Sequence, residues 1–279
     1  MSLFKELTAY MAEYNFYPSK KKAQNFLVSD QFLDEIVKAA HLEPSDTVLE
    51  VGAGTGFLTR ELLKHSKVVA SELDEKLCGL LREQFRAELE SKKLVLLEGN
   101  FLEQKLPKFN KVVSLPPYTI SSKLVLELVL EKHVESMVFV LQREFVKKCV
   151  SRPGFNDYGP LAVLLGYYFD DKVLEWNLSP ENFFPKPNSF SSLVVFSRKQ
   201  NIKTLNDESK FVFFLKTLFR YKNKKLSNAL EKSFPFLKKS MGFSKKGFEK
   251  TLEGLKEKDS KVYLLEPEEL VSIFQEFLK

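Results

Sequence analysis

The strongest constraint on the fold is an alternation of short apolar segments and amphipathic helices. Apolar segments that indicate strands occupy residues 47–54, 68–74, 94–100, 111–115 and 136–142. Residues 30–41, 57–65 and 75–90 instead place apolar side chains at helical spacing, with Asp30 as the expected N-cap of the first helix. Such alternation is typical of a parallel sheet with helices on both faces. The sequence therefore predicts an α/β fold.

The pattern changes after residue 142. Two later apolar segments, 160–169 and 192–196, are expected to add the final strands. Beyond residue 200 we see no strand pattern, and residues 211–232, 244–256 and 267–279 are predicted to be helices. The composition shifts toward lysine and phenylalanine at the same point. We therefore expect one domain over residues 1–200 and a small helical domain over residues 201–279.

The distribution of positive charge indicates which kind of partner the protein could bind. The 279 residues carry a net charge of +6. Lysines cluster at residues 20–22, 147–148, 222–225, 238–239 and 245–246. Clustered lysine is typical of binding to a phosphate backbone. Solvated surface is the alternative for any single cluster.

Several classes of protein are excluded by what the sequence lacks. Cys78 and Cys149 are the only cysteines, and the three histidines are far apart, so we expect neither a metal site nor a disulfide framework. The first residues show no apolar signal region, and the longest apolar segment, 161–169, is too short to span a bilayer. We expect a reduced, cytoplasmic protein without membrane contact.

A glycine-rich turn follows the first predicted strand, in the segment EVGAGTGFLT at 50–59. Glycines at 52, 54 and 56 allow positive φ and close approach of a ligand to the backbone. The G-x-G-x-G spacing fits the dinucleotide pattern G-x-G-x-x-G poorly, and the lysine of a phosphate-binding loop is missing. With Glu50 before the first glycine, the segment resembles the first motif of S-adenosylmethionine-dependent methyltransferases.

Two polar residues end the next strands. Glu72 lies about 20 residues past the glycines, where a carboxylate can hold the ribose hydroxyls of a nucleoside. An exposed charge at a strand end is the alternative. Asn100 ends the third predicted strand, where a polar side chain can meet the adenine of the same ligand. Because carboxyl ends of parallel strands share one edge, these residues are expected to form one crevice.

The fourth predicted strand runs into Leu115, Pro116, Pro117 and Tyr118 within VVSLPPYTISS. With this turn added, the chain closely resembles the ribosomal RNA adenine dimethyltransferase family. Other resembling segments are KKAQNFLVS (21–29), LQREFVKK (141–148), RPGFNDYGPLAVL (152–164), FFPKPNSFSSLVV (183–195) and FRYKNKKLSNAL (219–230). The resemblance thus covers nearly the whole chain.

The resemblance implies a Rossmann-like, seven-stranded, mostly parallel methyltransferase sheet and a small all-helical C-terminal domain that binds RNA. It also implies transfer of methyl groups from S-adenosylmethionine to N6 of adjacent adenosines near the 3′ end of small-subunit ribosomal RNA, each methylated twice, in ribosome biogenesis. The expected partner is the ribosomal RNA of the assembling small subunit. We expect a monomer that uses no metal.

Residue roles follow from the same resemblance. The cofactor contacts are expected at Asn25, Leu27, Gly52, Gly54, Glu72, Asn100 and Leu115. The catalytic turn is expected at Leu115, Pro116 and Tyr118. Tyr118 would stack on the target adenine, with Phe183 as a second wall. The ribosomal RNA would be held by a basic helix that carries Arg220, Lys222, Lys224 and Lys225.

The sequence departs from the family pattern at two positions. Asn100 stands where the family usually has Asp, which replaces a charge-assisted hydrogen bond by a neutral one. Leu115 stands where it has Asn, so its side chain offers no acceptor to the adenine amine. Losing one such transition-state hydrogen bond slows a reaction by about 10²–10³. The carbonyls of residues 115 and 116 remain, and Ser114 is expected to point away.

Functions from different classes stay open at this point. The first is an active adenine methyltransferase, favoured because the Pro-Pro-Tyr turn and the crevice are retained. The second is a catalytically weak or inactive ribosome-assembly or RNA-binding factor on the same scaffold. A methyltransferase of another specificity, such as a large-subunit antibiotic-resistance type, is a third.

Overall fold

The computed structural model describes residues 2–19, 24–200, 202, 205, 207–242 and 244–278. Lys20, Lys21 and Lys22, named above as a lysine cluster, lie outside the described residues. The chain divides into two compact units, Met1–Val146 with Asp171–Arg198 and Lys147–Asp170 with Lys199–Lys279. The first unit ends near the predicted boundary at 200, but residues 147–170 group with the second unit.

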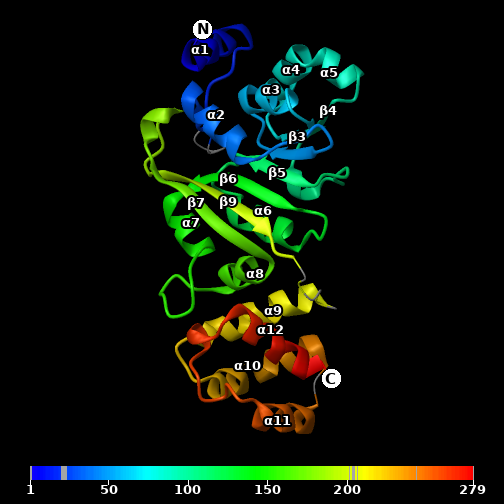
Figure 1. Cartoon of the computed structure of the whole chain (residues 1–279), viewed down its shortest axis with the longest axis vertical. Helices are drawn as coiled ribbons and strands as arrows, with labels where there is room; N and C mark the ends of the chain where they lie inside the picture. Colours follow the sequence, from blue (N-terminus) through cyan, green and yellow to red (C-terminus); the bar gives the residue numbers. More distant parts are fainter. Residues whose placement is uncertain are drawn as a thin grey trace. The chain divides into compact units, whose positions relative to one another are not determined.

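A seven-stranded sheet has the order β4-β3-β2-β5-β6-β9-β7 (Figure 1). Its strands are β2 Thr47–Val51, β3 Lys67–Glu72, β4 Leu94–Glu98, β5 Lys111–Ser114, β6 Ser136–Gln142, β7 Phe169–Leu178 and β9 Ser191–Arg198. The first five pair in parallel, and β9 pairs antiparallel with β6. The central strands are buried, as their continuous apolar segments require. The predicted α/β fold is confirmed.

Two predictions about the later strands differ in outcome. Residues 192–196 lie in β9, as expected, whereas the predicted strand at 160–169 is wrong because helix α8 occupies Pro160–Tyr168. A continuous apolar segment cannot by itself distinguish a buried helix from a buried strand, and Pro160 suits the first turn of a helix. The sequence also gave no sign of β7, whose residues 170–177 are mostly exposed at the sheet edge.

The helices of the first part of the chain are α1 Leu3–Glu13, α2 Asp30–Ala39, α3 Phe57–Leu63, α4 Glu75–Gln84, α5 Arg86–Glu90, α6 Ser121–Leu130 and α7 Arg143–Cys149. The predicted helix at 75–90 is interrupted at Phe85. Ser29 rather than Asp30 caps α2, because the Ser29 hydroxyl accepts the Phe32 N–H at 3.3 Å. A small sheet pairs β1 Phe26–Leu27 with β8 Phe183–Phe184.

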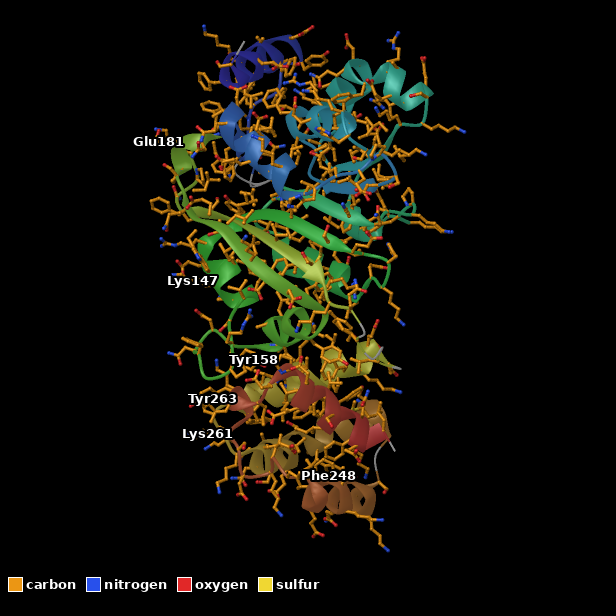
Figure 2. The ribbon with its side chains drawn as sticks, in the orientation of Figure 1. Lys147, Tyr158, Glu181, Phe248, Lys261 and Tyr263 are labelled. Atoms are coloured by element: carbon orange, nitrogen blue, oxygen red, sulfur yellow. The ribbon has the colours of Figure 1, made fainter. Side chains whose placement is uncertain are left out.

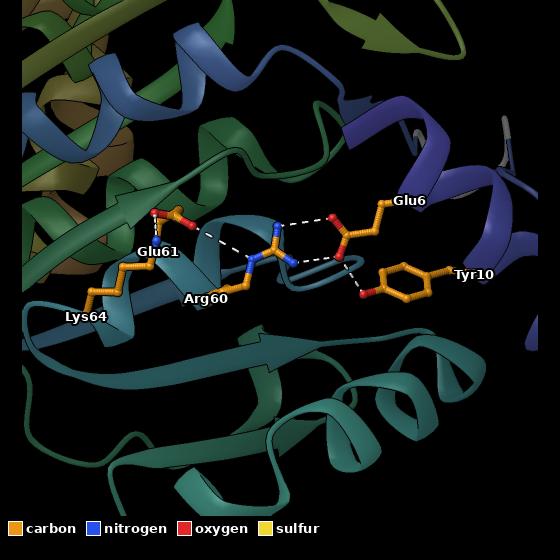
Figure 3. A network of polar contacts seen from close by, with 5 residues as sticks. All are labelled: Glu6, Tyr10, Arg60, Glu61 and Lys64. Atoms are coloured by element: carbon orange, nitrogen blue, oxygen red, sulfur yellow. Dashed lines mark hydrogen bonds and ion pairs between the residues drawn. The ribbon is translucent and has the colours of Figure 1, made fainter. Parts of the chain in front are cut away.

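A polar network ties α1 to α3, which begins at the glycine turn. Figure 3 shows the Glu6 carboxylate between the Arg60 guanidinium and the Tyr10 hydroxyl. Arg60 Nη1 donates to Glu6 Oε1 at 2.5 Å, and the Tyr10 hydroxyl donates to the same oxygen at 2.6 Å. Burial alone would raise the pKa of Glu6, but these two hydrogen bonds lower it overall. The ionised carboxylate therefore anchors α1.

The second unit is helical beyond residue 207. Its helices are α8, α9 Glu208–Leu218, α10 Leu226–Met241, α11 Lys245–Gly254 and α12 Pro267–Leu278. The single helix predicted over 211–232 is wrong, because the chain leaves α9 at Leu218 and resumes at Leu226. Residues 224–226 pair with 260–262 instead: Val262 N–H donates to the Lys224 carbonyl at 3.2 Å. This tertiary pairing overrides helix propensity.

Among the helices that the structure describes, none is long and apolar enough to cross a membrane.

Candidate active site

The turn between β2 and α3 approaches the Pro-Pro-Tyr turn closely. Gly52 has φ +82°, and a Cβ there would lie 3.0 Å from Pro117 Cδ. Gly54 has φ +59°, and its Cβ would lie 3.2 Å from the Phe26 ring. A side chain at either position would strain the backbone and push into the neighbouring segment. The glycines therefore let three segments distant in sequence meet at one place.

Glu72, at the end of β3, connects to the glycine turn directly. Its Oε2 accepts the Gly54 N–H at 2.8 Å, and its Oε1 accepts the N–H groups of Leu73 at 2.9 Å and Asp74 at 2.8 Å. Burial raises the pKa of Glu72, although these three hydrogen bonds oppose the shift. A carboxylate has about four acceptor positions, so a ligand hydroxyl can still donate to it.

We expect Glu72→Ala to weaken S-adenosylmethionine binding by about 1.5–3 kcal/mol, the usual loss of a hydrogen bond to a charged group. Calorimetric titration measures the effect. Thermal melts of the ligand-free variant are needed beside it, because the Gly54 N–H also loses its acceptor. Unchanged affinity in a folded variant would exclude Glu72 from the predicted cofactor contacts.

Glu50 lies in β2 with only 1% of its surface exposed. The Thr59 hydroxyl donates to Glu50 Oε2 at 2.6 Å. Burial raises the pKa of Glu50 from 4.5 to about 8, only partly opposed by the Thr59 hydrogen bond. The side chain is therefore protonated at neutral pH in the folded protein and ionised in the unfolded chain.

This difference predicts a pH-dependent stability. The folded state binds a proton that the unfolded state lacks, so the stabilisation is complete below about pH 4.5 and is lost as pH rises through about 8. Glu50→Gln keeps the size and an acceptor for Thr59 but cannot ionise. Chemical denaturation from pH 5 to 9 should show the variant gaining on the wild type by a few kcal/mol, at about 1.4 kcal/mol per pKa unit. Parallel pH profiles would contradict the buried proton.

A hollow of about 650 Å³, part of it open to solvent, lies between these segments. The predicted site residues that line it are Asn25, Gly52, Gly54, Glu72, Leu115, Pro116, Tyr118 and Phe183. A second hollow of about 410 Å³ shares Asn25, Gly52, Gly54 and Leu115 and adds Leu27 and Glu50. The structure thus brings together residues that span positions 25 to 183.

Asn100 does not line either hollow. Its side chain instead caps the short 3₁₀ helix Phe101–Glu103: Oδ1 accepts the Leu102 N–H at 3.2 Å, and Nδ2 donates to Glu103 Oε1 at 2.6 Å. Asn is a favoured N-cap residue, which gives it a structural role as it stands. Its contact with adenine stays a prediction.

The Pro-Pro-Tyr turn shows what Leu115 and its neighbours offer. The Leu115 side chain is half-buried against the hydrophobic core. Ser114 is fully buried and does not line the hollow, and its hydroxyl donates to the Val51 carbonyl at 2.7 Å. The Tyr118 hydroxyl lies 2.8 Å from Ser191 Oγ, and burial raises the pKa of Tyr118. The phenol is therefore neutral and is held through its hydroxyl.

Some residues of the hollow escaped the sequence analysis. Gln24 lines it and donates from Nε2 to Asp74 Oδ2 at 3.1 Å. Leu73, next to Glu72, also lines the hollow and is 62% exposed. Ser191 holds Tyr118, yet 73 residues separate the two. Gln24 and Ser191 lie within the resembling segments 21–29 and 183–195, where neither was assigned a role. The signal for Leu73 was an apolar residue at a strand end beside the candidate carboxylate.

The predicted RNA-contacting residues lie in the connection between α9 and α10 and not on one α-helix, with Arg220 in a short 3₁₀ helix, Phe219–Tyr221. Lys222 Nζ donates to the Asn156 carbonyl at 2.6 Å, and Lys225 Nζ lies 2.8 Å from Asp259 Oδ1. The Arg220 guanidinium is 5.5 Å from the centre of the Phe236 ring. Figure 2 labels Lys261 and Tyr263 on the segment that pairs with this connection. Lys224 is exposed and has no side-chain hydrogen bond or ion pair among the described residues.

Among the described residues, no group of three or more His, Cys, Asp or Glu side chains is arranged to hold a metal ion. That the reaction uses no metal stays a prediction.

A model of the family described as ribosomal RNA adenine dimethylase matches residues 17–272. The chain belongs to the ribosomal RNA adenine dimethylase family. Membership supports methyl transfer from S-adenosylmethionine to ribosomal RNA as the class of activity. The hollow fits such a cofactor, because the glycine turn leaves it space and Glu72 retains acceptor capacity beside it.

Relatives and solved structures agree with this membership. A probable ribosomal RNA small subunit methyltransferase A from Pyrococcus furiosus is 34% identical over 279 residues, covering 98% of this chain and 97% of the relative. A mitochondrial ribosomal RNA small subunit methyltransferase from Arabidopsis thaliana is 36% identical over 211 residues, covering 75% of this chain and 55% of the relative.

Among solved structures, a dimethyladenosine transferase from Plasmodium falciparum is 25% identical with a TM-score of 0.77, covering 90% of this chain and 97% of the other. The 23S rRNA methyltransferase ErmE is 24% identical with a TM-score of 0.63, covering 91% and 100%, and shows the shared fold.

Proposed function

We propose that this protein dimethylates N6 of two adjacent adenosines near the 3′ end of small-subunit ribosomal RNA. The observation that carries the proposal is the meeting of Tyr118 and Phe183 with the glycine turn and Glu72 in one hollow. An aromatic pair suits a flat base, and the turn and carboxylate suit a nucleoside. The name of the Plasmodium falciparum protein, a dimethyladenosine transferase, supports dimethylation of adenosine, and that of the Pyrococcus furiosus relative supports methylation of small-subunit ribosomal RNA.

In this proposal, one group of residues binds S-adenosylmethionine and another binds the target adenosine. Asn25, Leu27, Gly52, Gly54 and Glu72 hold S-adenosylmethionine, and Asn100 contacts its adenine. When bound, S-adenosylmethionine supplies an electrophilic methyl group. Tyr118 and Phe183 stack on the target adenosine, which must leave its own stack to enter the hollow.

The Pro-Pro-Tyr turn would then act on the adenine amine. The amine is a weak nucleophile because its lone pair is delocalised into the ring. Acceptors that take its protons help the nitrogen turn its lone pair toward the methyl group. In this chain the backbone carbonyls of Leu115 and Pro116 are the acceptors of the turn, since the Leu115 side chain has none and the Ser114 hydroxyl is buried outside the hollow.

Residues 201–279 are proposed to bind the ribosomal RNA in the cytoplasm, with the protein as a monomer. The four basic residues between α9 and α10 would contact phosphates. Because Lys222 and Lys225 already have protein partners, Lys224 is the one whose charge is most available.

We therefore expect Lys224→Ala to weaken subunit binding and to lower the salt slope by about one unit, as for one lost phosphate contact. Cofactor affinity should not change. Lys222→Ala is the matched comparison, and it should also lower thermal stability because the Asn156 carbonyl loses its donor. A salt slope unaffected by Lys224→Ala would mark this lysine as solvated surface.

Incubation with methyl-labelled S-adenosylmethionine and unmethylated small subunits tests the activity directly. The expected result is label on two adjacent adenosines, each with two methyl groups, when the modified bases are mapped. Label confined to isolated adenosines elsewhere in the small-subunit RNA would contradict the proposed specificity.

A second candidate function is that of an assembly factor with weak or no catalysis. The observation that favours it is the Leu115 side chain, which packs against the core where an acceptor would serve the reaction. Tight binding to unmethylated subunits with no detectable methyl transfer would support this alternative.

A further inference from the structure

An exposed aromatic ring and an arginine form a pair at the end of β6. Phe190 is 42% exposed. The Arg143 guanidinium lies 5.4 Å from the centre of the Phe190 ring, within the range of a cation–π contact. The backbone reinforces the pair, because the Arg143 N–H donates to the Phe190 carbonyl at 3.0 Å.

Other contacts fix the position of the guanidinium. Arg143 Nη1 donates to Asn177 Oδ1 at 2.9 Å, and Arg143 Nε donates to Glu144 Oε1 at 3.1 Å. Contacts with an amide and a carboxylate fix the guanidinium near the ring. The pair therefore presents a flat aromatic ring and a cation in fixed positions.

The pair lies beside the hollow. In the register of β6 with β9, Gln142 stands opposite Ser191, so Arg143 and Phe190 face each other just beyond the carboxyl end of β6. Val140 lines the hollow, and Arg143 follows three residues later, about 10 Å along an extended chain. Ser191, the neighbour of Phe190, holds the Tyr118 hydroxyl. The pair and the proposed base-binding turn thus share one edge of the sheet.

Exposure alone would not assign a role, because single apolar residues on a surface are common. The combination is more specific: unpaired RNA bases are recognised by stacking on aromatic rings and on arginine planes. A base taken into the hollow leaves its neighbour without its stacking partner. A flat surface next to the hollow is where that neighbour can regain one.

We propose that Phe190 and Arg143 form a stacking platform for the base adjacent to the target adenosine. This inference rests on the proposed function. In a pair of adjacent adenosines the neighbour of one target is the other target, so the platform would hold the second adenosine while the first is methylated. The platform would thereby favour substrates with a purine next to the target.

A thermodynamic cycle between protein and RNA tests the platform. The probe is a synthetic RNA strand with two unpaired adjacent adenosines, compared with strands in which the 5′ or the 3′ neighbour of one adenosine is abasic. Phe190→Ala should raise Kd, and KM for methylation, between about 5-fold and 150-fold on the intact strand. Removing the correct neighbouring base should raise Kd of the wild type by a similar factor. The same removal should raise Kd of Phe190→Ala very little. Phe190→Tyr should behave like the wild type.

Phe236→Ala is the matched control. The Phe236 ring is 46% exposed and lies under Arg220 at 5.5 Å, so the pair has the same chemistry. Phe236→Ala should change Kd by the same factor on the intact and the abasic strands, since Phe236 is not proposed to contact the neighbouring base. If Phe190 had only a structural role, Phe190→Ala would likewise change Kd by the same factor on the intact and the abasic strands.

The platform would be overturned if Phe190→Ala raised Kd by the same factor on the intact strand and on both abasic strands. The outcome is separable from that of the proposed function. If the wild type methylates no RNA, the proposed function fails, and the same cycle measured by fluorescence anisotropy of labelled RNA still decides whether Phe190 holds the neighbouring base.

Discussion

Leu115→Asn is expected to raise the methylation rate by one to three orders of magnitude, the scale of one transition-state hydrogen bond. The substitution adds a side-chain acceptor at the turn that meets the glycine loop, where the proposed reaction needs one. Cofactor affinity should change little, because glycine backbone and Glu72 contacts are untouched. Single-turnover rates with unmethylated small subunits measure the effect.

The same substitution should lower stability. Leu115 is half-buried against the core, so Asn would bury an amide without a partner in the absence of substrate, at a cost of about 1–3 kcal/mol. Leu115→Met is the matched control, since it changes the side chain without adding an acceptor of comparable strength. If Asn and Met give the same rate, the backbone carbonyls already suffice or catalysis is not the role of this chain.

Tyr118→Ala should slow methylation by about 5-fold to 150-fold or more, because stacking on a base contributes about 1–3 kcal/mol. The ring lines the hollow and is held through its hydroxyl by Ser191. Tyr118→Phe should retain most of the rate, since the stacking face remains. Ser191→Ala separates the contribution of the hydrogen bond from that of stacking, because it removes the partner of the Tyr118 hydroxyl and keeps the ring.

Thermal melts beside the rate assay distinguish stacking from packing. If Tyr118 were only a core aromatic, Tyr118→Ala would lose several degrees in Tm and keep a normal rate per folded molecule. The expected pattern is the opposite, a modest loss of stability with a large loss of rate. Cofactor titration of the variant serves as the control for an intact site.

The sequence by itself determined the α/β class, because alternation of strand and helix periods is a local signal. It also located the glycine turn and Glu72, since each lies at a strand end that apolar patterning reveals. The family resemblance supplied Tyr118 and Phe183, and the structure places both in the hollow with the glycines. These residues stay a proposed site until variants are measured.

Only the tertiary structure decided the rest. Residues 160–168 are apolar throughout, and their period does not reveal whether they form a strand or the helix that they adopt. The basic segment around Lys224 leaves the helix because residues 260–262 pair with it. Phe190 meets Arg143 through the pairing of β9 with β6, and Ser191 meets Tyr118 because β6 also pairs with β5, which Tyr118 follows. Such contacts join segments distant in the chain, and they are set by burial and hydrogen-bond pairing of the whole fold, which a local pattern does not encode.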